Sequence, residues 1–193
     1  MTASTVLRSR RDAICEAVYE LLAEVGYDRM TMDGVAERAR ASKATIYRMW
    51  PDKPRMVAEA LTQRFAGHTE VTDTGSLRGD LLALMRYACG VVDSSDGDVI
   101  SGVMTAAARE PALAAILHEC IIEQKKPVHA TLIRRAAARG EIPAETDPAL
   151  LHEVMHAMVL SRKLWGCQDG ARPDWAEQVV DDVLMPILNH PRS

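Results

Sequence analysis

The chain has 193 residues, of which 48% are hydrophobic, 26% charged and 4% aromatic, and its formal net charge is −4. Its four cysteines are widely separated and its N-terminus shows no signal-peptide pattern, which argues against a secreted disulfide scaffold. No apolar run approaches the length that crosses a bilayer, which argues against a membrane-spanning protein. We therefore expect a protein of the reducing cytoplasm. Abundant alanine and few alternating β-branched runs favour an all-α fold.

The first predicted helix runs from Arg10 to Val25, after a small and polar start at residues 1–9. Its apolar residues recur at the spacing of one helical face, and Gly26 is suited to cap its C-terminal end. That face comprises Ile14, Val18, Leu21, Leu22 and Val25. The pattern predicts a supporting helix with one buried side.

Two short helices are predicted between Thr31 and Pro51. Thr31 is suited to cap the first of them and Ser42 the second, while Pro51 forbids continuation beyond Trp50. The apolar stripe of the first comprises Met32, Val35, Ala36 and Ala39. In the second, we expect Ile46 and Met49 to face inward and Lys43, Ala44, Thr45, Tyr47 and Arg48 to lie on the outer surface.

Basic residues gather on and around the second of these helices. Residues 38–55 hold six Lys or Arg and one Asp, a local charge of +5. Such charge beside exposed hydroxyls and helix N-termini suits the phosphates of duplex DNA, although a solvated basic face is the plainer interpretation. The net charge is +2 over residues 1–55 and −6 over the remainder, so attraction to DNA would be local.

Several positions between Gly26 and Lys53 match a known pattern in one register. The matching segments are GYDRMTMDGVAERA, SKATIYRMW and PDK. They supply a Gly after the first helix, a Thr that opens the second, and a Ser-Lys-small-Thr-aliphatic-Tyr run followed by an aromatic residue and a turn ending in Lys. This pattern resembles the DNA-binding domain of TetR-family transcriptional regulators. The resemblance implies a helix-turn-helix whose second helix reads DNA.

Arg40 departs from that pattern, because the family usually has Gly at this turn. The position commonly needs a positive φ, which costs a non-Gly residue roughly 1 kcal/mol. The turn is therefore either strained or differently shaped. Ala44 replaces another frequent Gly, which should be harmless to the helix.

Asp52 is suited to cap a further helix, which in the resembled family connects the DNA-binding domain to the rest of the chain. Its apolar side comprises Met56, Val57, Ala60, Leu61 and Phe65. Gly, Thr and Asp then cluster from Gly67 to Gly75, which indicates a boundary. We therefore expect a three-helix DNA-binding domain at residues 1–54, a connecting helix to about residue 66, and a helical ligand-binding and dimerisation domain at residues 76–193.

Helix start and stop signals divide that second domain. The starts are marked by Ser76, Asp98, Pro111, Asp147-Pro148 and Arg172-Pro173-Asp174, and the ends by Ser94, Arg109, Gly140, Gly166 and Pro191. Pro127 should kink or interrupt the third of these helices. The last two of these helices are rich in apolar residues and are joined by a short loop. Trp165 belongs to the apolar stripe of the first of the two. This suits a four-helix interface with a second copy.

The resemblance implies that the second domain binds a small-molecule effector and forms a homodimer. Two recognition helices on a two-fold axis would read a palindromic operator in double-stranded DNA, and a repressor of this kind is released when the effector changes their separation. The effector pocket is expected at Met85, Cys89, Met104, Leu117, Cys120, Met155 and Trp165, all of which equally suit a plain core. The dimer interface is expected at Leu151, Met155, Met158, Trp175, Val179, Val183 and Ile187.

The DNA contacts are expected on the two short helices and the turns beside them. Thr31, Lys43, Thr45, Tyr47 and Lys53 are expected at the phosphate backbone, Ala44 and Arg48 at base edges, and Arg40 and Ser42 beside them.

A competing motif lies at residues 152–156, where His152, Glu153 and His156 complete the pattern HExxH. Two histidines one helical turn apart can bind zinc while the intervening Glu activates water, and Glu177 is the tempting third ligand downstream. A zinc-dependent hydrolase is therefore the alternative function, and a module whose basic face binds an acidic protein is a third hypothesis. The motif lies inside an amphipathic helix whose packing explains it, so we expect no metal, no cofactor and no enzyme activity.

Overall fold

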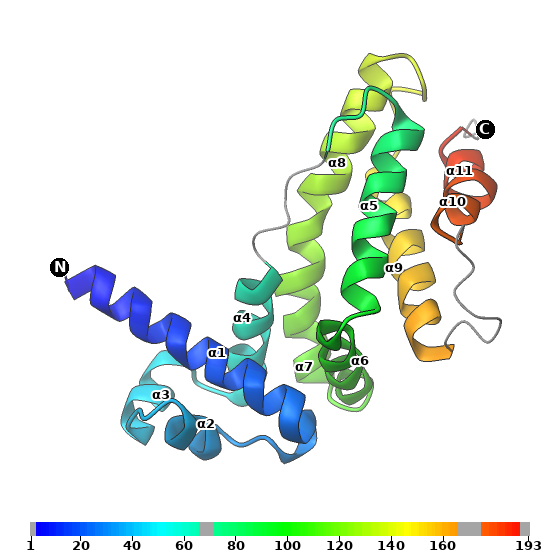
Figure 1. Ribbon diagram of the computed structural model, residues 1–193. Coiled ribbons are helices and arrows are strands. Elements are labelled where there is room, and N and C mark those ends of the chain that lie inside the picture. Colours follow the sequence, from blue (N-terminus) through cyan, green and yellow to red (C-terminus); the bar gives the residue numbers. More distant parts are fainter. Residues whose placement is uncertain (1–2, 66–71, 166–174, 190–193) are drawn as a thin grey trace. The chain divides into compact units, whose positions relative to one another are not determined.

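The computed structural model describes residues 3–65, 72–165 and 175–189, and every regular element within these ranges is a helix (Figure 1). The chain forms two compact units. The first comprises residues 1–68 and 98–124, and the second comprises residues 69–97 and 125–193. This division differs from the predicted domains at residues 1–54 and 76–193, because residues 98–124 belong to the unit that contains the predicted helix-turn-helix.

The first unit is organised around α1 and α4, which pack against each other. Its helices are α1 (Ala3–Arg29), α2 (Met32–Arg38), α3 (Lys43–Met49), α4 (Lys53–Phe65), α6 (Ser95–Ala107), α7 (Pro111–Leu117) and the π-helical turn η1 (His118–Ile122). α4 also packs against α7 and η1, and the Thr62 hydroxyl donates to the carbonyl oxygen of Cys120 at 3.3 Å. These contacts tie residues 98–124 to the helix-turn-helix.

The core of the first unit is formed by apolar stripes on each of its helices. α1 begins at Ala3 rather than at the predicted Arg10, and Gly26, with a φ of 75°, ends its regular part as expected. Side chains that are at most 1% exposed include Ile14, Val18, Val35, Ile46, Met56, Val57 and Leu113. α3 is held in place mainly by this packing, since a helix of seven residues is not stable by itself.

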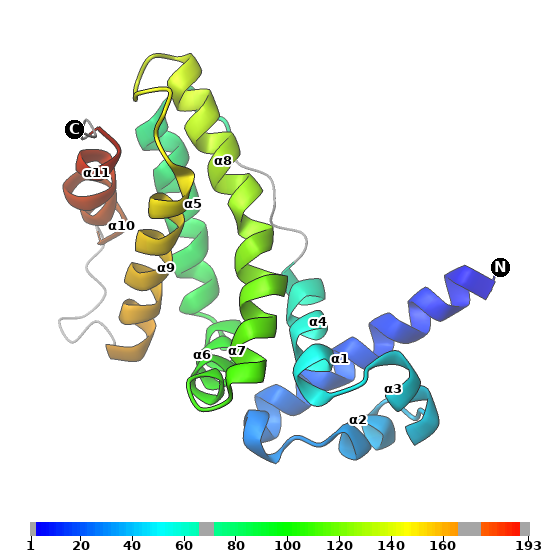
Figure 2. The ribbon, with the colours of Figure 1, turned by 180° about the vertical axis from the view of Figure 1, so that it is seen from behind.

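The second unit is a helical bundle, which Figure 2 shows from behind, and its helices enclose a hydrophobic core of their own. Its helices are α5 (Leu77–Val92), α8 (Glu123–Ala138), α9 (Pro148–Trp165), α10 (Trp175–Val179), the π-helical turn η2 (Val180–Leu184) and α11 (Met185–Asn189). α5 packs against α9, α10 and η2. The most deeply buried core residues are Leu77, Leu81, Met85, Leu132, Ala136 and Val180.

Helix caps account for most of the helix starts that the sequence predicted. In each case a side-chain oxygen accepts a hydrogen bond from a backbone N–H two or three residues further on, which satisfies a donor that the first turn leaves open. The five confirmed caps, at 2.8 to 3.2 Å, are Thr31, Ser42, Asp52, Ser76 and Asp147.

Pro127 does not break its helix, and α8 continues through it. The departure from regular α-helical geometry lies earlier, in the π-helical turn η1. A π-helical turn is a known cause of irregularity within a longer helix. The predicted signals at Gly166 and at residues 172–174 lie outside the described residues. Among the helices that the structure describes, none combines the length and apolarity needed to cross a membrane.

Candidate nucleic-acid interface

The turn between α2 and α3 is a Schellman motif with Arg40 at its left-handed position. The Arg40 N–H donates to the carbonyl of Glu37 at 3.1 Å, and the Ala41 N–H donates to the carbonyl of Ala36 at 2.9 Å. Arg40 has a φ of 49° and is the one non-glycine residue in the described ranges with a positive φ. The family's usual turn is therefore retained, and Arg40 adopts the conformation that favours Gly.

α3 presents one continuous outer face. Ser42 caps its start, where its Oγ lies 2.8 Å from the Thr45 hydroxyl and accepts from the Thr45 N–H at 3.2 Å. The exposed positions follow helical periodicity and comprise Lys43, Ala44, Tyr47 and Arg48. The expectation that Thr45 lies on this surface is wrong, because Thr45 is only 9% exposed and its hydroxyl is turned toward the cap. The outer face of α3 therefore carries the ammonium of Lys43, the phenol of Tyr47 and the guanidinium of Arg48 around the small residue Ala44.

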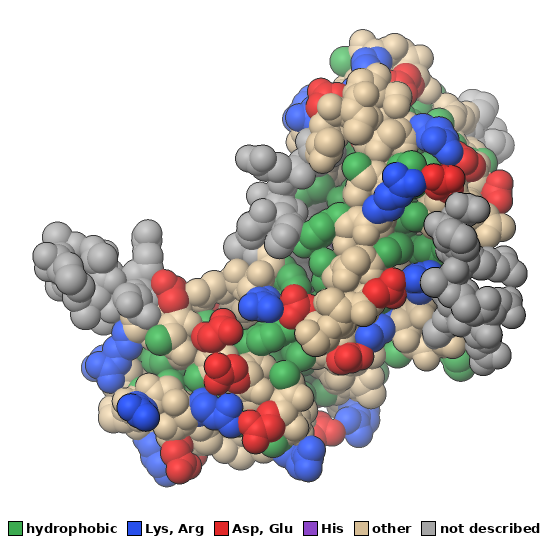
Figure 3. Space-filling view, viewed as in Figure 1, with side chains coloured by type: hydrophobic (Ala, Val, Ile, Leu, Met, Phe, Trp, Pro, Cys, Tyr) green, Lys and Arg blue, Asp and Glu red, His purple; other side chains and the backbone are tan. Residues whose placement is uncertain are grey.

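Acidic side chains already hold several of the basic residues near this face. Lys43 Nζ lies 2.6 Å from Asp33 Oδ2 of α2, and Arg38 forms ion pairs with Glu20 and Glu24 of α1. Within the described residues, Arg40 and Arg48 form no ion pair. Figure 3 shows Lys and Arg side chains along the edge where Figure 1 draws α3. Asp33 was not predicted as a partner, although an acid at the start of one short helix and a Lys at the start of the next is a recognisable signal.

Lys53 lies at the start of α4 in a partly apolar setting. Its Nζ is 4.0 Å from the centroid of the Tyr27 ring, a cation-π contact, and burial lowers the pKa of Lys53. Thr31 and Ser42 are exposed while serving as caps. The predicted DNA-contact residues other than Thr45 therefore reach solvent from α2, α3 and the start of α4.

The residues predicted for an effector pocket divide between the two units. Met104, Leu117 and Cys120 pack with the core of the first unit, whereas Met85, Cys89, Met155 and Trp165 belong to the second. Trp165 is 76% exposed, so the expectation that it lies on an inward stripe is wrong. Apolar periodicity marks a buried face but does not say which helix covers it.

The residues predicted for the dimer interface likewise differ in exposure. Leu151, Met155 and Val179 are buried within one protomer's own core. Met158, Trp175, Val183 and Ile187 are half-buried. On α9, Leu150, Leu164 and Trp165 are exposed apolar residues. The exposed apolar side chains of α9 therefore do not coincide with the residues that were predicted for the interface.

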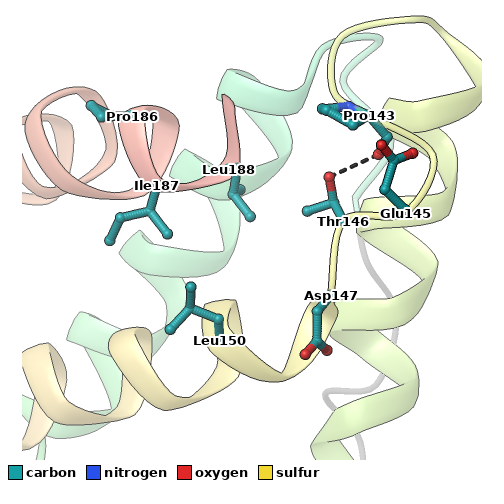
Figure 4. A pocket seen from close by; sticks show the side chains of 8 residues that line it. All are labelled: Pro143, Glu145, Thr146, Asp147, Leu150, Pro186, Ile187 and Leu188. Atoms are coloured by element: carbon teal, nitrogen blue, oxygen red, sulfur yellow. Dashed lines mark hydrogen bonds between the residues drawn. The ribbon is translucent and has the colours of Figure 1, made fainter. Parts of the chain in front are cut away.

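A cavity of about 440 Å³ lies within the second unit, between the loop before α9, the start of α9 and α11. Leu150 and Ile187 point toward each other across it, with Leu188 beside them (Figure 4). Thr146 donates to the carbonyl of Pro143 at 2.7 Å and closes the loop on one side. None of the residues predicted for the effector pocket lines this space; of the predicted interface residues, Ile187 does.

The HExxH motif is built into the packing of the second unit. His152 is 4% exposed, and its Nδ1 lies 3.2 Å from Nδ1 of His129 on α8, while the His152 and His156 rings are 4.5 Å apart. Glu177, the suggested third ligand, instead accepts a hydrogen bond from Arg86 at 2.7 Å. Among the described residues, no group of three or more His, Cys, Asp or Glu side chains could hold a metal ion. The geometry gives the hydrolase alternative no support.

Comparisons with known proteins agree with this arrangement over most of the chain. Residues 14–60 match the family of bacterial regulatory proteins of the tetR family, and residues 71–183 match the tetracyclin repressor-like C-terminal domain. The chain is 32% identical over 179 residues to an uncharacterised HTH-type transcriptional regulator of Mycobacterium tuberculosis, with 93% of this chain and 88% of the other covered. It is also 32% identical over 182 residues to the DNA-binding transcriptional repressor TetR of Mycobacteroides abscessus, with 93% and 94% covered.

Solved structures share the fold. The TetR family transcription regulator SCO0332 superposes with a TM-score of 0.74 at 25% identity, covering 94% of this chain and 99% of the other. The transcriptional regulator FadR of Bacillus subtilis, solved with stearoyl-CoA, gives a TM-score of 0.66 at 15% identity, covering 93% and 98%. With a capped helix-turn-helix, an exposed α3 face and matches to both family domains, the chain belongs to the TetR family of DNA-binding transcriptional regulators.

Proposed function

We propose that this regulator is a homodimeric repressor that binds a palindromic operator through the outer face of α3 and is released by a small-molecule effector. The observation that carries the proposal is the face formed by Lys43, Ala44, Tyr47 and Arg48. Lys43 and Tyr47 suit phosphates, and Arg48 suits the paired acceptors of a guanine edge. Arg40, Ser42, Thr31 and Lys53 would add backbone contacts at the ends of the helices, and Thr45 would act through the cap.

A second copy is needed because α3 is short. Seven residues reach only a few base pairs, whereas two copies on a two-fold axis read an inverted repeat. We assign the dimer surface to α9 and the helices after residue 175. The predicted residues that keep some exposure are Met158, Trp175, Val183 and Ile187, and the exposed Leu164 and Trp165 extend the surface. Residues 76–193 would thus supply dimerisation, in keeping with the predicted domain.

Selection of bound duplexes from a randomised library tests the DNA and dimer parts together. The recovered sites should be inverted repeats, and sedimentation of the complex should give two protomers per site. In the same assay Arg48→Ala should relax the sequence preference at one position of each half-site, while Lys43→Ala should weaken all sequences evenly. Single, unrepeated sites bound by one protomer would refute the dimeric part of the proposal.

We place the effector site in the second unit. The cavity beside Leu150 and Ile187 is within the size range of small-molecule sites, and the same fold holds an acyl-CoA in the Bacillus subtilis relative. Met85, Cys89 and Met155 offer adaptable side chains elsewhere in this unit.

Stearoyl-CoA and smaller amphiphiles are suitable first probes for release of the selected duplex, followed by fluorescence anisotropy. Leu150→Arg would introduce a charge into the cavity and should abolish the response to an active probe. Because Leu150 lies on α9 and Ile187 also belongs to the proposed dimer surface, sedimentation must first show that the variant is still a dimer. An unchanged response would place the effector site outside this cavity.

A further inference from the structure

Three elements of the first unit meet at the carboxylate of Glu59 on α4. The indole Nε1 of Trp50, the residue that ends α3, donates to Glu59 Oε2 at 2.9 Å. Arg11 of α1 donates from Nε and Nη2 to the two oxygens of the same carboxylate, and its guanidinium carbon lies 5.1 Å from the centroid of the Trp50 ring. Glu59 therefore joins α1, α4 and the C-terminal end of α3.

The contact is strong because the indole is buried and the acceptor is charged. Trp50 is 2% exposed, and a buried indole N–H left without an acceptor is destabilising. Burial alone would raise the pKa of Glu59, but hydrogen bonds from Arg11 and Trp50 outweigh it and the pKa is lowered. The carboxylate is thus ionised at neutral pH and accepts charge-assisted hydrogen bonds.

The position of this contact determines what it controls. Ser42 fixes the N-terminal end of α3, and Trp50 follows its last residue directly. Tyr47 and Arg48 lie within one helical turn of Trp50, so a rotation of the Trp50 end would displace both side chains from the DNA face. Side chains that must meet a partner with hydrogen-bond geometry tolerate displacements of only about 0.5 Å.

We propose that Glu59 is a positioning residue for DNA recognition, which holds the end of α3 through the Trp50 indole and is itself held by Arg11. It acts through Trp50 rather than by contacting DNA. This inference rests on the proposed role of the outer face of α3.

A purely electrostatic role and a positioning role for Glu59 predict opposite changes in operator affinity for the same substitution. Glu59→Gln removes a negative charge from the unit that binds a polyanion, which alone would tighten binding to any duplex. If Glu59 positions α3, the substitution weakens binding to the selected operator instead. Binding to an unrelated duplex, which depends mainly on phosphate attraction, should stay equal or become slightly tighter.

The experiment measures Kd for the selected operator and for a scrambled duplex across a salt series, with the full-length chain. Glu59→Gln replaces the charged acceptor by a neutral one, and Trp50→Phe removes the indole donor together with part of the buried ring system. Each should weaken operator binding about tenfold, with scrambled binding and the salt slope nearly unchanged. The double variant should weaken operator binding by less than the product of the two single effects, because both substitutions act on the same hydrogen bond. Glu37→Gln, the same charge change on an exposed residue of α2, should leave operator binding equal or slightly tighter.

Circular dichroism and denaturation at the assay temperature show whether each variant is folded. If Glu59→Gln does not fold, the Trp50→Phe variant alone tests the proposal. Equal or tighter operator binding by Glu59→Gln, or a parallel loss on both duplexes, would overturn the positioning role. Arg48→Ala separates the proposed role of Glu59 from the proposed function of the outer face of α3. If that variant binds like the parent, the proposed function of the α3 face fails; if it weakens binding while Glu59→Gln and Trp50→Phe do not, only the role of Glu59 fails.

Discussion

Arg40 occupies a backbone conformation that glycine adopts more easily. At a φ of 49° the Cβ atom crowds the neighbouring carbonyl, while the Schellman hydrogen bonds hold the turn in place. Arg40→Gly should therefore stabilise the first unit by about 0.5–1 kcal/mol, after allowance for the greater freedom of Gly in the unfolded chain. Urea denaturation followed by Trp50 fluorescence, in a chain with Trp165 and Trp175 replaced by Phe, measures the free energy of unfolding of the first unit.

Arg40→Ala is the matched control for that change, since it removes the same charge and keeps the strained φ. It should show no comparable gain in stability. If Arg40 also contacts a phosphate, both variants should lose the same DNA affinity. Equal stability of the Gly and Ala variants would show that the turn is unstrained.

If Lys43 contacts DNA as proposed, Asp33 competes with the phosphates for its ammonium group. The pair is solvent-exposed, with the two side chains 49% and 67% exposed, so water and salt screen it and its own contribution to stability is small. Asp33→Asn frees the ammonium and removes a charge that repels phosphate. Operator and scrambled duplexes should both bind roughly two- to fivefold tighter at low salt. The gain should disappear in a Lys43→Ala background, and a gain that persisted there would assign the effect to general repulsion.

At the scale of single elements, local chemistry made most of the helix boundaries predictable. Thr31, Ser42 and Asp147 cap their helices through side chains only two or three residues away, so no tertiary information is needed. The outer face of α3 also follows from its 3.6-residue period. Thr45 was misplaced because its hydroxyl prefers the Ser42 cap, and the bond between Trp50 and Glu59 depends on how α3 packs on α4.

The start of α5 and the end of α8 are joined through Asp80, which is fully buried. It accepts hydrogen bonds from the backbone N–H and the hydroxyl of Thr74, both at 2.7 Å, and from Arg139 at 3.1 Å. Burial would raise the pKa of Asp80, but these hydrogen bonds outweigh it and lower the pKa. A carboxyl whose pKa is lower in the folded state stabilises that state above its unfolded pKa, and this contribution is lost as the pH falls through the folded pKa.

Asp80→Asn should destabilise the second unit by about 1–3 kcal/mol at pH 7, because the ionised acceptor is lost. The difference from the parent should shrink as the pH falls below about 4, the ordinary pKa of an Asp in the unfolded chain, toward the lower pKa of Asp80 in the folded state. Urea denaturation at several pH values measures the difference. Asp73→Asn is the control, since Asp73 lies 3.5 Å from Arg139 but is 55% exposed, and it should change stability little. A constant Asp80→Asn effect from pH 7 to pH 3 would contradict the assigned ionisation.

At the scale of the whole molecule, the family and the all-α fold were predictable, but the membership of each compact unit was not. The segment from 98 to 124 reads as another amphipathic helix pair, and nothing local shows that Leu113 and Leu117 pack into the core with α4. Long-range packing decides this, and periodicity reports only that a face is apolar. The same limit applies to the predicted effector pocket, whose residues divide between the two cores.

The uneven charge of the chain sets how its DNA binding should respond to salt. Residues 1–55 carry +2 and the remainder −6, so binding depends on a few local contacts rather than on overall attraction. The logarithm of affinity changes with the logarithm of salt concentration by about −0.9 per phosphate neutralised. Lys43→Ala removes one such contact per protomer. It should therefore reduce the slope by about 1.8 if two protomers bind each operator, and by about 0.9 if one does.

Arg134→Ala is the control for this measurement, because it removes the same charge from an exposed position on α8 in the other compact unit. Its slope should match that of the parent. An unchanged slope for Lys43→Ala would show that the ammonium stays paired with Asp33 in the complex. The Asp33→Asn variant separates that outcome from a wrong assignment of the DNA face: a slope that became steeper on freeing Lys43 would mean that the ammonium can reach a phosphate once its carboxylate competitor is gone.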